Sequence, residues 1–325
     1  MLDSYFEEKT KAFAKATQLG TPQVIQSLWS GYGEILRTPL PDGIFPSIIV
    51  KHIDLSPSPQ HPRGWNSGFS HQRKLKSYEI EARWYSQWSE QCPAGARIPK
   101  FLGFAHTEHA YIIVMEDLDA QGFPIRKSEV ERKDLYNCIK WLAQFHGNFI
   151  NQKPEGLWEN GCYWHLDTRP EELEKMANSP LKTFAKAIDE KLKNTSHPTL
   201  LHGDAKLANF CFGEDGSKVA VVDFQYIGGG CGMKDLAYFL SSCLDENELF
   251  NSEKPILDFY FKELRNGISS KDIDLNKLEK EWRELYPYAW ADFVRFLEGW
   301  SPGHWKLNNY AKEKTDRVIT ELQNT

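Results

Sequence analysis

Three side chains whose oxygen atoms could bind a metal ion or accept a proton lie within the segment 200–225. The tripeptide His-Gly-Asp ends at Asp204, Asn209 follows, and Asp223 comes after thirteen further residues. Between Asn209 and Asp223 apolar residues alternate around a turn at 214–216, which predicts a β-hairpin. Because a hairpin returns the chain to its starting point, we expect Asp223 beside Asn209, with Asp204 on the loop before them.

These residue types suit phosphoryl transfer. Mg²⁺ prefers carboxylate and amide oxygens together with waters and phosphate oxygens, and Asp223 and Asn209 supply the first two kinds. Transfer also needs a carboxylate that accepts or orients the proton of the attacking hydroxyl, a role that fits Asp204. Lys206 can place a cation near the transferring group. The plain alternative is a pair of loop ends with solvated acids, but the ordered set with its hairpin favours the chemistry.

The elements that must position these residues fall into two parts. Helices are predicted at 5–19 and 72–90, β-strands at 44–53, 98–105 and 111–116, and a loop rich in proline and glycine at 56–68. After residue 119 the pattern is mostly helical, at 128–152, at 171–193 and from 234 onward. We therefore expect a bilobal α+β fold. An N-terminal lobe (1–118) would hold an antiparallel sheet with one main helix, and the larger C-terminal lobe (119–325) would be mostly helical.

Composition narrows the function classes. The chain has 325 residues and a net charge of -6, with 45 acidic against 39 basic side chains, which argues against a broad nucleic-acid-binding face. No apolar run approaches the ~20 residues of a membrane-spanning helix, and the N-terminus carries no secretory signal pattern. The six cysteines are far apart and form no Cys-x-x-Cys pair, which argues against a zinc cage. We expect a cytoplasmic protein that binds neither nucleic acid nor membrane.

The His-Gly-Asp-x-x-x-x-Asn motif that ends at Asn209, followed by Asp223-Phe224-Gln225, resembles the catalytic and metal loops of the protein-kinase-like fold. The His-Gly-Asp form is similar to that of aminoglycoside phosphotransferases and choline kinases. With the hexapeptide that begins at Asp235, the chain most resembles the ecdysteroid-kinase-like group within that branch. The resemblance covers about residues 25–245 and implies a kinase with ATP and Mg²⁺ as cofactors.

The resemblance also implies residues that hold the nucleotide. Lys51, at the end of a short run of β character, resembles the lysine that binds the α- and β-phosphates. Its glutamate partner should be Glu81, which lies on the apolar strip of the 72–90 helix, whereas Glu79 suits a surface ion pair. Gly31 and Gly33 would form a phosphate loop before the lysine strand, although a simple turn is an equal alternative.

The remaining implied positions concern the adenine and the supports of the catalytic loop. The strand 111–115 and the residues after it resemble the hinge between lobes, where backbone groups of Glu116 and Leu118 would pair with the purine. His146, His202 and Asp235 are interpreted as supports of the catalytic loop, because a carboxylate at the start of a helix suits its exposed N–H groups.

The acceptor is expected to be a small molecule. Only eleven residues separate Asp223 from Asp235 and no Ala-Pro-Glu sequence follows, so a peptide-docking segment has no room. We therefore favour transfer of the γ-phosphate to a hydroxyl of an amino alcohol, an aminosugar or a sterol-like alcohol. A protein kinase and a nucleotide-binding pseudokinase without transfer activity are the alternatives.

The segment 282–310 holds nine aromatic residues with Asp292 and Glu298 among them. Aromatic faces with acids can surround an ammonium group, and aromatic faces alone can line a pocket for an apolar alcohol. The same spacing is also that of a packed core helix. The segment 162–169 is a second candidate for a wall of the acceptor pocket.

Overall fold

The computed structural model describes residues 2–28, 31–55, 68–270 and 272–324. The chain divides into two compact units. The first comprises residues 1–92, 97–126 and 211–225, and the second comprises 93–96, 127–210 and 226–325. The first unit thus continues past the expected boundary near Leu118 and takes in the 211–225 hairpin. The reason is backbone pairing, since Phe212 exchanges hydrogen bonds of 2.9 and 3.1 Å with Ile125.

The first unit is built on an antiparallel five-stranded sheet, as the sequence predicts. The strand order is β1-β2-β3-β5-β4, and each neighbouring pair is antiparallel. The strands are β1 (Gln23–Ser27), β2 (Gly33–Pro39), β3 (Ser47–Asp54), β4 (Phe101–His106) and β5 (Ala110–Glu116). Strands β1 and β2 were not among the strands expected from the sequence.

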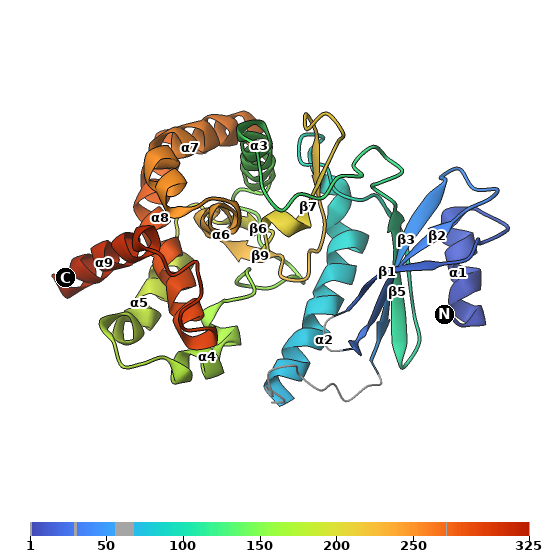
Figure 1. Cartoon of the computed structure of the whole chain (residues 1–325), viewed down its shortest axis with the longest axis horizontal. Coiled ribbons are helices and arrows are strands. Elements are labelled where there is room, and N and C mark those ends of the chain that lie inside the picture. The colour runs from blue at the N-terminus through green and yellow to red at the C-terminus, as the bar shows by residue number, and fades with distance from the viewer. Residues whose placement is uncertain (1, 29–30, 56–67, 271, 325) are drawn as a thin grey trace. The chain divides into compact units, whose positions relative to one another are not determined.

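Helices cover both faces of this sheet (Figure 1). Helix α1 (Ser4–Ala14) packs Phe6 against Val50 and its neighbours in one apolar cluster. Helix α2 (Gly68–Arg83) lies on the other face. Because successive side chains of a strand point to opposite faces, Lys51 lies on the α2 side when Val50 faces α1. The sheet therefore directs the lysine toward the helix that was expected to carry its partner.

The second unit is mostly helical, as expected (Figure 1). Its helices are α3 (Arg132–Asn148), α4 (Pro170–Lys175), α5 (Pro180–Lys193), α6 (Met233–Cys243), α7 (Glu246–Gly267), α8 (Leu275–Trp300) and α9 (Asn309–Gln323). The single helix predicted at 171–193 is two helices, because Ser179 caps a new helix start by accepting the backbone N–H of Lys182 at 3.2 Å. Across the described residues, none of the helices combines the length and the apolar character that crossing a membrane requires.

Two short strand pairings shape the loops around the predicted catalytic segment. Strand β6 (Thr199–Leu201) pairs antiparallel with β9 (Gly228–Gly230). Strand β7 (Phe210–Phe212) pairs with β8 (Val219–Val221), which is the hairpin that alternation predicted. The proline-rich loop expected at 56–68 lies almost wholly outside the described residues.

Candidate functional site

The expected ion pair between Lys51 of β3 and Glu81 of α2 is present. The Lys51 Nζ lies 2.5 Å from Glu81 Oε2 and 3.5 Å from Asp223 Oδ1. Burial alone lowers the pKa of Lys51, but the charges of Glu81 and Asp223 outweigh it and hold that pKa above its usual value. Glu79 is exposed, in line with its predicted surface position. The first unit thus carries a buried lysine whose positive charge is stabilised by two carboxylates.

Asp223 is held by its backbone and by a neighbouring amide. Its φ of +73° lies in the left-handed region, which aspartate tolerates better than most residues. Gln225 donates from Nε2 to Asp223 Oδ1 at 2.7 Å, and its Oε1 accepts from Lys74 Nζ at 2.7 Å and from Ser77 Oγ at 3.3 Å. Helix α2 therefore positions the predicted metal ligand through Gln225, a contact that sequence reasoning missed.

Phe224, between Asp223 and Gln225, anchors the same segment by apolar packing. The ring is fully buried, stacks on Trp84 at 4.9 Å between centroids and meets Tyr85 edge-on at 5.9 Å. Both partners belong to a π-helical turn, Trp84–Trp88, that continues α2. The expected helix at 72–90 therefore changes its geometry where it receives the phenylalanine, a feature often found at functional sites.

Gly31 lies between β1 and β2 and Gly33 is the first residue of β2, with φ of +79° and +127°. A Cβ at Gly33 would lie 2.1 Å from the carbonyl oxygen of His52, whereas a Cβ at Gly31 would meet no atom of the described residues within 4 Å. Gly33 is therefore required for close packing on β3, whereas no described residue would clash with a side chain at Gly31. Ser30, the first residue of the predicted phosphate loop, lies outside the described residues.

The connector after β5 is tied to the sheet by its side chains. The Asp117 carboxylate accepts from Arg37 Nε at 2.6 Å and from Ser47 Oγ at 2.7 Å. Leu118 is 3% exposed, and its N–H has no hydrogen-bond partner among the described residues. Buried N–H groups are nearly always paired, so an open donor here fits an acceptor from a ligand. Glu116 ends β5 beside it, at the predicted hinge position.

The second unit brings Asp204, Lys206 and Asn209 together. Lys206 Nζ lies 2.9 Å from Asp204 Oδ2, and Asn209 donates from Nδ2 to the Asp204 carbonyl oxygen at 2.7 Å. Asn209 Oδ1 receives no hydrogen bond from any residue that the structure describes. With its nitrogen held by the catalytic loop, the asparagine presents an amide oxygen of the kind that Mg²⁺ binds.

The predicted catalytic loop is held from α6 by hydrogen bonds, as expected for a support role of Asp235. The fully buried Asp235 accepts the backbone N–H groups of His202 at 2.6 Å and of Gly203 at 3.0 Å. His146 Nε2 lies 3.2 Å from the same carboxylate. Gly203 has a φ of +83°, and a Cβ there would lie 2.0 Å from the carbonyl oxygen of Tyr226. His146, His202 and Asp235 are therefore structural supports of the loop that carries Asp204.

Most of the aromatic residues in 282–310 form core, so packing explains them. Seven of the nine are at most 2% exposed: Trp282, Tyr286, Tyr288, Trp290, Phe293, Phe296 and Tyr310. Asp292 is also fully buried, with Lys234 Nζ at 3.0 Å and Arg295 Nη2 at 2.7 Å. Despite its burial, these two cations hold the pKa of Asp292 below its usual range. This carboxylate therefore serves the core and does not face a ligand.

Two tyrosines pack against buried aromatic residues of the segment 282–310, Tyr163 on Phe296 and Tyr238 on Phe293. Tyr163, from the second candidate wall, donates its backbone N–H to the Gly203 carbonyl oxygen at 3.0 Å, and its ring lies 5.4 Å from that of Tyr238. Burial, with the nearby Tyr163 and the charge of Asp204, raises the pKa of Tyr238 well above its usual value. Both rings thus lie near Asp204 within the second unit.

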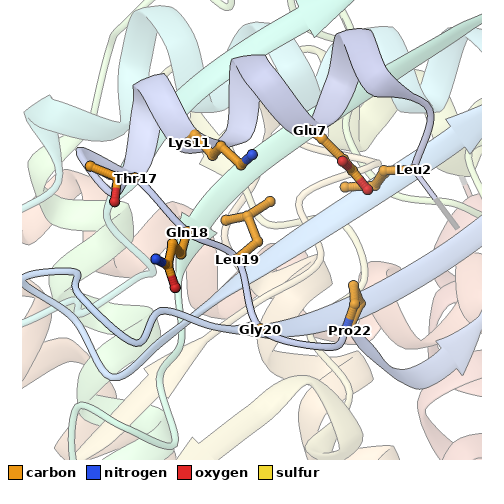
Figure 2. Close-up of a pocket in the computed structure, with 8 residues that line it drawn as sticks. All are labelled: Leu2, Glu7, Lys11, Thr17, Gln18, Leu19, Gly20 and Pro22. Atoms are coloured by element: carbon orange, nitrogen blue, oxygen red, sulfur yellow. The ribbon is translucent and has the colours of Figure 1, made fainter.

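A pocket of the first unit lies apart from all of these residues (Figure 2). Its lining comes from Glu7 and Lys11 of α1 and from the segment 17–22 that follows the helix, with Leu2 at its edge. None of the residues predicted for nucleotide, metal or catalysis lines it. The pocket therefore has no part in the site described above.

Comparison with known proteins identifies the fold. No curated protein sequence matches the chain. The microcompartment-associated aminopropanol kinase has 14% identity and a TM-score of 0.51, and the match covers 97% of this chain and 94% of that one. A protein of Haemophilus somnus 129PT assigned as a fructosamine-3-kinase has 14% identity and a TM-score of 0.52, with 98% and 99% covered. At such identities the likeness concerns the fold alone.

The family comparison concerns the part of the chain that holds the predicted catalytic loop. Residues 148–271 match the Ecdysteroid kinase-like family, a stretch that includes Asp204, Asn209, Asp223 and Asp235. This match agrees with the resemblance carried by the motifs. The chain therefore has a kinase-like fold, shared with these two structures, and its residues 148–271 match the Ecdysteroid kinase-like family.

Proposed function

We propose that the chain is an ATP- and Mg²⁺-dependent O-phosphotransferase that acts on a hydroxyl of a small molecule. The observation that carries the proposal is that two groups of residues are each already in contact. Lys51, Glu81 and Asp223 meet in the first unit, and Lys206 and Asn209 meet around Asp204 in the second. Each group is a half of what phosphoryl transfer needs.

The residues present fit the cofactors. The N–H of Leu118, which has no partner among the described residues, suits a ring nitrogen of adenine, and the backbone N–H groups near Gly31 and Gly33 suit phosphate oxygens. Lys51 would hold the α- and β-phosphates, and Asn209 and Asp223 would hold Mg²⁺. The bound metal would neutralise charge on the phosphate oxygens.

The chain's own residues would then handle the acceptor. Asp204 would accept or orient the proton of the acceptor hydroxyl, leaving its oxygen free to attack. Lys206, whose Nζ is already 2.9 Å from Asp204 Oδ2, would stabilise negative charge on the transferring group. The support of the loop by Asp235 would keep this carboxylate in place during the reaction.

A protein substrate is disfavoured by the segment between Phe224 and α6. Its strand β9 is paired with β6, and its backbone also bonds with the segment 158–161. Trp158 donates to Ile227 at 3.1 Å and accepts from Gly229 at 3.1 Å. This short segment is therefore fully engaged within the second unit, which favours a small acceptor over a docked peptide.

Transfer of label from γ-labelled ATP to a library of small alcohols tests the proposal. We expect Mg²⁺-dependent labelling of an alcohol by the wild-type chain and loss of labelling in Asp204→Asn and Asp223→Asn. Glu79→Gln, on the exposed side of α2, is the control and should label normally. Labelling of proteins but of no alcohol would favour the protein kinase, and nucleotide binding without any transfer would favour the pseudokinase.

A further inference from the structure

One lysine near Asp204 has no role in the mechanism above. Lys306 lies in the turn between α8 and α9, and its Nζ lies 5.0 Å from the ring centre of Tyr238 and 5.6 Å from that of Phe293. Trp305 is a third ring, at 5.5 Å. These distances are those of cation–π contacts, so the ammonium of Lys306 already occupies a set of aromatic faces.

Lys306 is paired with no acid among the described residues. It forms no ion pair within the parts of the chain that the structure describes, although it is half-buried. Burial lowers the pKa of Lys306 to about 8, an effect that Cys243 and Asp204 partly offset, so it remains a cation at neutral pH. The charge of Lys306 therefore interacts with that of Asp204, but no described residue accepts a hydrogen bond from its Nζ.

A second cation, Arg169, also lies on aromatic rings of this region, and the nearby acids are already paired with cations. Arg169 lies over the rings of Tyr163 and Phe296 at 5.5 and 5.3 Å, so it fills the next aromatic faces of the cluster. Asp292 forms ion pairs with two buried cations, and Asp204 forms one with Lys206.

Glu298 is the other acid that the sequence singles out. At 100° per residue it lies on roughly the opposite side of α8 from Phe296 and Trp300. It therefore does not add a negative charge to the aromatic cluster. The described residues leave this cluster without an acid that is available to an ammonium ligand.

We propose that Lys306 determines the charge of the acceptor, so that the alcohol phosphorylated here is neutral or anionic where it approaches Lys306, with one of its oxygens accepting from Lys306 Nζ. An ammonium group would have to displace a like charge from the same aromatic faces. This inference rests on the proposed function, and it separates the chain from kinases whose acceptors are amines.

The test is a binding measurement that needs no phosphoryl transfer. Choline and its neutral isostere 3,3-dimethylbutan-1-ol are titrated by calorimetry into the full chain, into Lys306→Met and into Lys306→Arg. We expect Lys306→Met to gain at least tenfold in choline affinity relative to the isostere, because the rings are vacated. Lys306→Arg keeps the charge and should behave as wild type, as should Lys312→Met, an exposed lysine of α9.

Two results would overturn the inference. One is a wild-type chain that binds choline as tightly as the isostere or more tightly. The other is a folded Lys306→Met chain that gains no affinity for choline. Either result leaves the proposed function standing, because that function fails only when label transfer to alcohols fails.

Discussion

Asp235→Ala should uncouple the catalytic loop from α6. The carboxylate accepts two backbone N–H groups, from His202 and Gly203, in a site with no solvent exposure. Truncation leaves both donors buried and unpaired, at about 1–3 kcal/mol each, so we expect the free energy of unfolding to fall by about 4 kcal/mol. Asp235→Asn keeps the volume and one accepting oxygen, and should lose about half as much.

Denaturant unfolding measures these losses, and label transfer from ATP measures their consequence for the loop. Asp245→Ala is the matched control, because Asp245 also accepts a backbone N–H at a helix start, at 2.8 Å, but it is exposed. This surface cap should be worth about 1 kcal/mol, with transfer unchanged. Displacement of Asp204 in the Asp235→Ala chain should slow transfer about 100-fold.

The result that would refute this reasoning is an Asp235→Ala chain with the stability of the Asp245→Ala control and normal transfer. It would mean that the two N–H groups find water or another acceptor, and that the loop holds its shape without α6.

Two further predictions concern backbone strain and pH. Gly203→Ala should lower the free energy of unfolding by about 3 kcal/mol, through backbone strain and a clash with the Tyr226 carbonyl. Gly303 has the same φ of +83° but no described atom within 4 Å of its Cβ position, so Gly303→Ala should cost only about 1 kcal/mol. Equal losses in denaturant unfolding would contradict the clash. Burial, with the charges of Lys234 and Lys193, lowers the pKa of His165 to about 3. Below about pH 6.5 the unfolded chain therefore binds a proton at His165 that the folded chain does not bind. From pH 7 to pH 5 this residue should lower the free energy of unfolding by about 2 kcal/mol. His165→Gln should remove most of that difference, and an unchanged dependence of unfolding on pH would show that His165 is not its source.

Much of the site was predictable because its information is local. The motif from His202 to Asn209 and the hairpin alternation lie in one short segment, so spacing alone places Asp204 and Asn209 on a common loop. The choice of Glu81 over Glu79 followed from helical periodicity, since one position faces the apolar strip and the other faces solvent.

What sequence reasoning missed depends on tertiary pairing. Strand β1 is an edge strand whose residues are all exposed, so it lacks the alternation that marks a half-buried strand. The tie from Arg37 to Asp117 exists only because β2 and the connector after β5 meet in the folded sheet. Asp292 looked available to a ligand because the lysine that neutralises it, Lys234, lies on a different helix.

Lys306 illustrates the same limit for function. A single lysine in a turn has no signature of its own, and its contact with the rings of Tyr238 and Phe293 arises from the packing of α6 against α8. By contrast, the aromatic excess of 282–310 was visible in the sequence, but burial was needed to show that most of it is core.

The central claim is that Asp204 acts on the acceptor while the nucleotide is held elsewhere, and Asp204→Asn tests it most directly. Calorimetric titration of Mg·ATP and the rate of label transfer are measured on the same preparation of this variant and of wild type. We predict an ATP dissociation constant within about twofold of wild type and a kcat lower by about 10²–10⁴-fold, the usual contribution of a general base. Transfer within tenfold of wild type, or a loss of ATP binding as large as the loss of transfer, would contradict the assignment.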